Sequence, residues 1–253
     1  ADKTKISKRK NPVSLNYYQE EGYLKEGILN FLALMGWSFG ENKEIFTIEE
    51  MIENFSFDKI SLGGPVFDLV KLGWVNNHHM RLKDLDELTK LAIPYFVKAG
   101  YYADENLSDE EFSKLRRIVE ISREGAHTLK ELPEISSIYF EDEFELPVVE
   151  EGMNKKARKS VEKLRNSLET EVGKKSIELF VEKINALNEE ISEEEAKEIL
   201  HGLQDELGEG PAAVLMPLRA VVTGKARGAD LYTVIAVIGK ERTLKRVQNT
   251  LEK

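Results

Sequence analysis

Apolar residues recur at three- and four-residue intervals along most of the chain, a spacing that places them on one face of an α-helix. Between residues 25 and 37, the apolar positions Ile28, Phe31, Leu32 and Met35 give the width of a buried helical face. The sequence shows no sustained alternation of apolar and polar residues, which would indicate strands, and no short-period repeat. We expect short strands only near residues 57–61 and 78–82.

Capping residues and glycines indicate where the helices begin and end. Thr47 with Glu50, and Ser192 with Glu195, have the spacing of a capping box, in which each residue satisfies a free backbone N–H near the other. Glycines mark several joints, and Gly239 separates the last two helices. The helices expected in chain order are 14–21, 25–37, 47–55, 66–76, 82–97, 108–124, 154–171, 173–188, 192–207, 210–222, 230–238 and 240–252.

An acidic stretch separates two groups of these helices. It runs from Leu132 to Gly152 and includes Pro133 and Pro147, which is the composition of a connector between domains. Between residues 131 and 151 the chain has eight acidic residues and no lysine or arginine. The pattern as a whole therefore predicts a mainly α chain, with a small mixed domain first and helical regions after it.

Composition limits the class of protein and the kinds of site. A chain of 253 residues can form one large domain or two to three small ones. The absence of cysteine excludes disulfides and thiolate metal sites and favours a reducing, cytoplasmic location. No apolar run approaches the roughly 18 residues that span a bilayer, so we expect no membrane partner. His78 and His79 are adjacent and project in different directions, so no metal site is expected.

Charge is unevenly distributed along the chain. The net charge of −10 argues against a protein coated in nucleic acid. Five basic residues and no acidic one nevertheless lie between Lys3 and Lys10, and seven basic residues stand against two acidic ones between Arg219 and Arg246. This distribution allows one basic face on an acidic protein. The alternative is a scatter of separately solvated charges.

A basic motif near the start of the chain carries the sharpest chemical signal. Lys5-Ile6-Ser7-Lys8-Arg9 resembles the Lys-Met-Ser-Lys-Ser loop of class I aminoacyl-tRNA synthetases, in the form typical of the glutamyl branch. Adenylate formation places extra negative charge on phosphate groups, which positioned ammonium groups stabilise. By this resemblance Lys8 contacts the phosphates of ATP, and Lys5 and Ser7 hold the mobile loop. Alone, such a motif could also be a basic tail.

Further segments match the same family in order and extend the resemblance over essentially the whole chain. They are residues 11–18, 21–23, 29–37, 44–47 and 61–68, then Lys71-Leu72, Trp74 and Asn76, and near the end Pro217-Leu218-Arg219, Thr223-Gly224 and 239–242. The chain is therefore similar to the C-terminal half of a bacterial-type glutamyl-tRNA synthetase. The family's Rossmann-type catalytic half, with its His-x-Gly-His signature, has no counterpart in the sequence, and the start without Met suggests a fragment.

The resemblance implies a division of the chain and a role for each part. Residues 1–82 would form the stem-contact fold, 83–137 a first helical anticodon-binding subdomain, and 138–253 a second one. The longer enzyme would attach L-glutamate to tRNA with ATP and Mg²⁺ through glutamyl-adenylate. The fragment alone would be inactive and would bind no cofactor tightly. We expect a monomer that binds tRNA-Glu and no DNA.

One candidate region for reading tRNA is the expected helix 108–124. RNA loops are read by side chains that contact phosphates and splayed bases, and Arg116, Arg117 and Arg123 are suited to this. The alternative is a solvated helix in which these arginines pair with Glu120 and Glu124.

The end of that helix also bears on specificity. Where family members that reject glutamine tRNA carry an arginine, this chain has Gly125. Loss of that donor implies relaxed specificity, with tRNA-Gln accepted beside tRNA-Glu. The alternative is that Gly125 is a simple helix C-cap.

The resemblance assigns further anticodon contacts near the C-terminus, at Arg219, Lys225, Arg227, Gly228 and Leu231. A different class of function remains open beside tRNA binding. The chain could be a stand-alone helical adaptor or RNA-binding protein without ligase activity, with residues 5–9 as an incidental tail.

Overall fold

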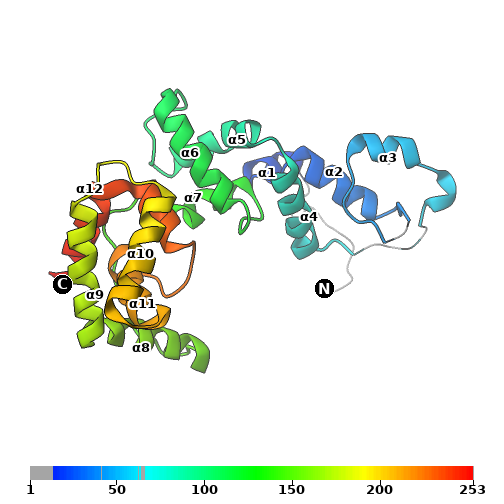
Figure 1. Cartoon of the computed structure of the whole chain (residues 1–253). Coiled ribbons are helices and arrows are strands. Elements are labelled where there is room, and N and C mark those ends of the chain that lie inside the picture. The colour runs from blue at the N-terminus through cyan, green and yellow to red at the C-terminus, as the bar shows by residue number, and fades with distance from the viewer. Residues whose placement is uncertain (1–13, 41, 62, 64–65, 253) are drawn as a thin grey trace. The chain divides into compact units, whose positions relative to one another are not determined.

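The computed structural model describes residues 14–40, 42–61, 63 and 66–252. The chain divides into two compact units, Ala1–Ser136 and Ser137–Lys253, called unit 1 and unit 2 below. Helices dominate both units (Figure 1), which confirms the prediction of a mainly α chain. Among the described residues, the β-type pairing consists of one isolated antiparallel bridge between Trp37 and Ile60. The three-part division at residues 82 and 137 stays a prediction.

Unit 1 contains seven α-helices and two short 3₁₀ helices within its described residues. They are α1 (Leu15–Glu20), α2 (Lys25–Leu34), α3 (Ile48–Asn54), η1 (Phe57–Lys59), α4 (Leu69–Leu82), α5 (Leu85–Lys98), α6 (Asp109–Ser122), η2 (Leu129–Glu131) and α7 (Leu132–Ile135). Helix α2 packs on α4, and α5 packs on α6. The first pair encloses a core that includes Tyr18, Phe31, Leu72 and Val75.

The two short strands expected in unit 1 are absent from its described residues. At 57–61 the chain forms the single 3₁₀ turn η1, because the Ser56 hydroxyl accepts from the backbone N–H of Asp58 and bends the chain there. Residues 78–82 belong to α4, which begins after the cap residue Asp68 and runs six residues beyond its expected end. Burial of Met80 on this last stretch stabilises the helix where sequence pattern alone was ambiguous.

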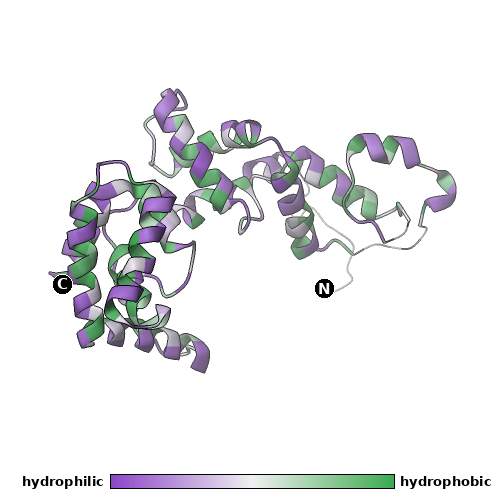
Figure 2. Cartoon of the chain, viewed as in Figure 1, coloured by the Kyte–Doolittle hydropathy of each residue, from purple (hydrophilic) through white to green (hydrophobic). Residues whose placement is uncertain are grey.

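Within its described residues, unit 2 is a bundle of five α-helices preceded by a 3₁₀ turn and an irregular segment. The elements are η3 (Ser137–Tyr139), α8 (Lys155–Glu169), α9 (Glu171–Asn185), α10 (Glu193–Leu207), α11 (Pro211–Thr223) and α12 (Leu231–Leu251). Helix α11 is central, since it packs against α8, α9 and α12. Hydrophobic and hydrophilic residues follow one another in stripes along these helices (Figure 2), as expected where one face is buried.

The last helix is bent where the sequence predicted a joint. Gly239 has φ 75° and ψ 179°, so it interrupts α12 without ending it. The backbone N–H of Lys240 donates instead to the carbonyl oxygen of Glu189, at 3.2 Å. Within the described residues, no helix combines the length and hydrophobicity that crossing a bilayer requires.

Candidate nucleic-acid interface

Turn 123–127, which follows α6, is held in place by Asn76 and Asn77 of α4. Nδ2 of Asn77 donates to the carbonyl oxygens of Arg123, at 2.9 Å, and of Ala126, at 2.6 Å. Nδ2 of Asn76 donates to the carbonyl oxygen of the last residue of the turn, at 2.7 Å. Both asparagines are buried. The turn is therefore fixed against α4 by side chains that have few other conformations available.

Gly125 is exposed within this turn. Its φ lies outside the left-handed region, and a Cβ added there would meet only the carbonyl oxygen of Ser122, at 4.0 Å. Helix α6 has its C-cap at Arg123, with a right-handed backbone. The alternative that Gly125 is a helix C-cap is therefore wrong, and nothing in the local geometry requires glycine.

The three arginines of α6 and its cap differ in their partners. Arg116 forms an ion pair with Asp86 of α5, and Arg117 pairs with Glu120 one turn further along α6, at 2.7 Å. Nε of Arg123 is buried and donates to no acceptor among the described residues. The alternative of pairing within the helix holds for Arg117.

In unit 2, loop 224–230 joins α11 to α12 and is closed by hydrogen bonds across its base. Nη2 of Arg219, in the penultimate turn of α11, donates to the carbonyl oxygen of Ala229 at 2.8 Å. The backbone N–H of Lys225 donates to Oγ1 of Thr223 at 3.1 Å. These bonds join the two ends of the loop to the same helix, so the loop is shaped before any ligand arrives.

The loop presents two cations to solvent and keeps a third beneath them. Lys225 and Arg227 are exposed, and neither forms an ion pair with a carboxylate in the described part of the chain. Gly228, also exposed, has φ 148°, and a Cβ there would lie 3.8 Å from Nη1 of Arg219. Burial lowers the pKa of Arg219, and the nearby Asp230 offsets this in part.

Both ends of loop 224–230 are packed. Gly224 has φ 63°, and a Cβ on it would overlap the ring of Phe144. No residue with a side chain fits there unless Phe144 moves. Leu231, the first residue of α12, is buried. Leu231 therefore supports the loop from within and does not reach its exposed side.

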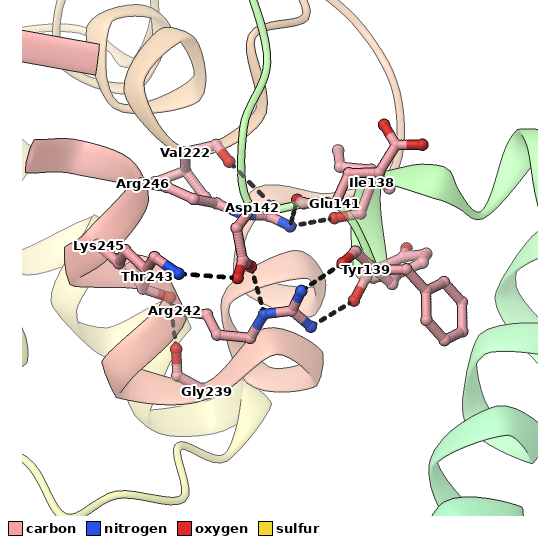
Figure 3. A network of polar contacts seen from close by, with 11 residues as sticks. Ile138, Tyr139, Glu141, Asp142, Val222, Gly239, Arg242, Thr243, Lys245 and Arg246 are labelled. Carbon is pink, nitrogen blue, oxygen red and sulfur yellow. Dashed lines mark hydrogen bonds and ion pairs between the residues drawn. The ribbon is translucent and has the colours of Figure 1, made fainter. Parts of the chain in front are cut away.

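Phe144 belongs to residues 138–147, called the strap, which two arginines of α12 hold onto unit 2 (Figure 3). Arg246 is 1% exposed. Its Nη2 donates to the carbonyl oxygens of Ile138, at 2.7 Å, and Glu141, and its Nη1 donates to that of Val222, at 3.2 Å. Burial lowers its pKa to about 10. One side chain thus joins the strap to the last turn of α11.

Arg242 makes a second set of bonds to the strap (Figure 3). Its Nε lies 2.6 Å from Oδ1 of Asp142, and its terminal nitrogens donate to the carbonyl oxygens of Tyr139, at 2.9 Å, and Phe140. Lys245 reaches Oδ2 of Asp142 at 3.1 Å. Several cations of the basic cluster 219–246 are therefore directed inward, and the cluster does not form one exposed basic face.

Helix α8 carries a basic cluster that sequence reasoning overlooked. Between residues 155 and 165 the sole acidic residue is Glu162, and the basic ones are Lys155, Lys156, Arg158, Lys159, Lys163 and Arg165. Three of them lie in the first turn, where the positive end of the helix dipole disfavours a cation by roughly 0.3–1 kcal/mol each. The run of basic residues is visible in the sequence and could have identified this cluster.

The histidines lie where packing accounts for them. Nε2 of His79 is 2.9 Å from Oδ1 of Asn30 in α2, and burial lowers the pKa of this histidine. Nδ1 of His78 is 2.9 Å from the carbonyl oxygen of Trp74, one turn earlier in α4.

The third predicted site, Lys5, Ser7 and Lys8, lies outside the described residues, so the roles implied for those three stay predictions.

Two family models match the chain in succession. The model described as "tRNA synthetases class I (E and Q), catalytic domain" matches residues 1–74. The model described as "Anticodon binding domain" matches residues 87–251. The second match contains turn 123–127, loop 224–230 and α8.

Curated relatives match over 99–100% of the chain. A glutamate–tRNA ligase of Fusobacterium nucleatum subsp. nucleatum is 59% identical and is covered to 50% of its length, and one of Thermus thermophilus is 38% identical and covered to 49%. A solved glutamate tRNA ligase from Elizabethkingia meningosepticum, in complex with its amino acid, shares 28% identity with a TM-score of 0.73. The whole of this chain matches 49% of that one.

The chain spans about half the length of the curated relatives it matches. These matches confirm the resemblance that the sequence motifs predicted, and the helical fold agrees with it. The chain therefore belongs to the anticodon-binding domain family and is homologous to the corresponding part of the glutamate–tRNA ligases.

Proposed function

We propose that this chain is the tRNA-binding part of a glutamate–tRNA ligase and that it reads the anticodon with loop 224–230 and turn 123–127. The observation that carries the proposal is loop 224–230. The bond from Arg219 to Ala229 shapes it, and it exposes the side chains of Lys225 and Arg227, which form no ion pair within the described residues. A preformed loop with available donors can bind unstacked bases and phosphates at a small ordering cost.

The two cationic layers of this loop have separate roles in the proposal. Arg227 contacts the RNA directly, since an exposed guanidinium can donate a pair of hydrogen bonds to a base or a phosphate. Arg219 acts as a positioning residue, because its donor is used by the backbone of the loop. Lys225 and Gly228 complete the exposed side. Gly228 leaves room for a base to approach the backbone.

Turn 123–127 adds a specificity element. An arginine at position 125 would favour one particular base, and Gly125 supplies no such donor. The anticodons of tRNA-Glu and tRNA-Gln differ at their third base, C in one and G in the other. We therefore propose that the ligase accepts both tRNAs. Arg116, Arg117 and Arg123 would add attraction for the phosphates near the turn rather than this discrimination between bases.

The reaction of the longer protein follows from its family. It would activate L-glutamate with ATP and Mg²⁺ to glutamyl-adenylate and transfer the amino acid to tRNA. Lys8 would stabilise charge on the ATP phosphates, and Lys5 and Ser7 would hold the loop that carries it. The chain alone should not support glutamate-dependent ATP–pyrophosphate exchange. Measurable exchange by the purified chain would contradict this, and Lys8→Ala in the longer enzyme should slow activation without unfolding it.

The binding proposal is tested by measuring affinity for a tRNA-Glu transcript and for duplex DNA of equal charge across a salt series. Non-specific electrostatic binding depends on salt and treats the two polyanions alike. We expect tRNA-Glu to bind more tightly at every salt concentration. Equal affinities would favour the alternative of a helical adaptor with incidental basic patches.

A further inference from the structure

Helix α8 carries six basic residues and one acidic residue between positions 155 and 165, and loop 224–230 does not account for them. We propose that the exposed face of α8 is a second RNA-contact surface, which binds the sugar–phosphate backbone of the tRNA whose anticodon loop 224–230 reads. The inference rests on the proposed function and extends it from the anticodon to the adjoining phosphates.

Three lysines of α8, called the ladder below, lie in a row along the helix. Lys155, Lys159 and Lys163 are each four residues apart, so they rise along one side of the helix in steps of about 6 Å. All three are exposed, whereas Val161 and Leu164 on the opposite side are buried. A line of ammonium groups on one side of a rigid helix suits a chain of phosphates better than it suits a single small anion.

These cations lack the carboxylate partners that the lysines of the neighbouring helix α9 have. In the described part of the chain, no carboxylate forms an ion pair with Lys155, Lys159 or Lys163. On the neighbouring helix α9, by contrast, Lys174, Lys175 and Lys183 pair with glutamates, the last two at 3.0 Å and 2.8 Å.

The basic residues in the first turn of α8 also support an external anionic partner. The first turns of α9 and α10 carry glutamates, as the helix dipole favours, whereas that of α8 carries only basic charges. Folding alone does not favour this arrangement. An external anion that covers the cations would.

Helix α8 is tied to the loop that the proposal concerns. Nη1 of Arg165 donates to the carbonyl oxygens of Leu146 and Pro147, both at 3.3 Å, in the strap. Phe144 of the strap lies against Gly224 at the start of the loop, and α8 packs on α11, which leads into it. The ladder extends from Arg165 about 15 Å toward the N-terminus of α8. A ligand in contact with both surfaces must be elongated and polyanionic, as an RNA hairpin is.

The test compares two triple variants of the full chain that lose the same charge. Lys155→Gln/Lys159→Gln/Lys163→Gln removes the ladder, and Lys174→Gln/Lys175→Gln/Lys183→Gln removes paired lysines of α9. Affinity for the tRNA-Glu transcript is measured between about 50 and 300 mM salt. Each lost phosphate contact should lower the salt slope by about 0.7–0.9. The ladder variant should therefore lose about 2–3 in slope and bind about tenfold or more weakly at moderate salt, and the α9 variant should match the wild type.

A ladder variant that keeps the wild-type slope, with circular dichroism confirming its fold, overturns the inference. So does an equal loss in both variants, which would indicate a general charge effect. Failure of the proposed function is different, since the wild type would then not prefer tRNA-Glu to duplex DNA. A parallel measurement uses vesicles of phosphatidylserine and phosphatidylcholine. Vesicle binding that depends on the ladder, with tRNA binding unchanged, would assign the face to a lipid surface and overturn the inference.

Discussion

Unit 2 uses arginine in two opposite ways. Arg246 is 1% exposed and donates to carbonyl oxygens of the strap and α11, whereas Arg227 is exposed and forms no ion pair within the described residues. The first has exchanged water for fixed backbone acceptors, so its loss leaves buried acceptors unpaired. The second stays hydrated, and its removal breaks no internal bond. Substitution of Arg246 should therefore lower the stability of unit 2, and substitution of Arg227 should weaken RNA binding.

The largest effect is expected at the buried cation. Arg246→Ala should lower the free energy of unfolding of unit 2 by about 3 kcal/mol or more, because three backbone carbonyls lose a charged donor. Urea unfolding followed by far-UV circular dichroism should show a transition at lower denaturant. Trp37 and Trp74 both lie in unit 1, so tryptophan fluorescence reports on that unit and should be unchanged.

Lys245→Ala is the matched control for this change. Lys245 lies on the same helix and contacts the strap at Asp142, but its side chain is exposed, so we expect a loss of less than about 1 kcal/mol. If the two variants unfold at the same urea concentration, the buried bonds of Arg246 add no net stability and the comparison fails.

The next effect separates Arg219 from Arg227. Arg227→Ala should weaken binding of tRNA-Glu by about 1–3 kcal/mol and leave the thermal midpoint unchanged. Arg219→Ala should weaken binding by a similar amount but also lower the midpoint, because the carbonyl oxygen of Ala229 loses its donor. Isothermal titration and thermal melts of the same samples provide both quantities. Lys174→Ala, which removes an exposed lysine of α9, controls for the change in charge. A lowered melting temperature in Arg227→Ala would contradict the distinction between Arg219 as a positioning residue and Arg227 as an RNA contact.

A selective effect of similar size is expected at Gly125→Arg. The substitution fits the turn without strain, since a Cβ would meet only an oxygen at 4.0 Å. It should weaken binding of tRNA-Gln relative to tRNA-Glu by about 1–3 kcal/mol, the discrimination that a paired donor can give. Gly202→Arg adds the same charge at a position on α10 with open space and should not change the ratio. An unchanged ratio in Gly125→Arg would reject relaxed specificity through this residue.

The smallest effect is expected at the start of α8, where charge opposes the helix dipole. Lys155→Glu/Lys156→Glu should raise the stability of unit 2 by about 0.3–1 kcal/mol for each residue while weakening tRNA binding. Lys163→Glu, near the middle of the helix, should weaken binding without the gain in stability. Melting temperatures from circular dichroism check the first quantity. A melting temperature for the double variant at or below the wild type would mean that these lysines cost nothing in folding.

The sequence predicted the helices well because their signals are local. The capping boxes at Thr47 and Ser192 are both present, with reciprocal hydrogen bonds. Errors arose where distant residues decide the outcome. Helix α4 extends to Leu82 because His79 and Met80 near its end are buried, and His79 bonds to Asn30, 49 residues earlier in the chain. Local pattern contains no information about such a partner.

The candidate site was predicted less completely, for the same reason. Arg219 and Arg227 were both chosen from a motif, but only the structure separates the positioning residue from the exposed one. Arg242 and Arg246 looked like part of a basic face, yet their bonding partners in the strap lie 100 or more residues away. The basic run of α8 was visible in the sequence. That its lysines lack partners was not.

The strap changes what counts as the smallest independently folding piece of this protein. Judged by helical pattern alone, the bundle of unit 2 starts at Asn154, just before α8. A fragment trimmed to that residue would strip Arg246 of its acceptors at Ile138 and Glu141 and would remove Phe144 from Gly224. Protease digestion should therefore stop short of residues 138–147, and any truncation meant to preserve the bundle has to begin at or before Ser137.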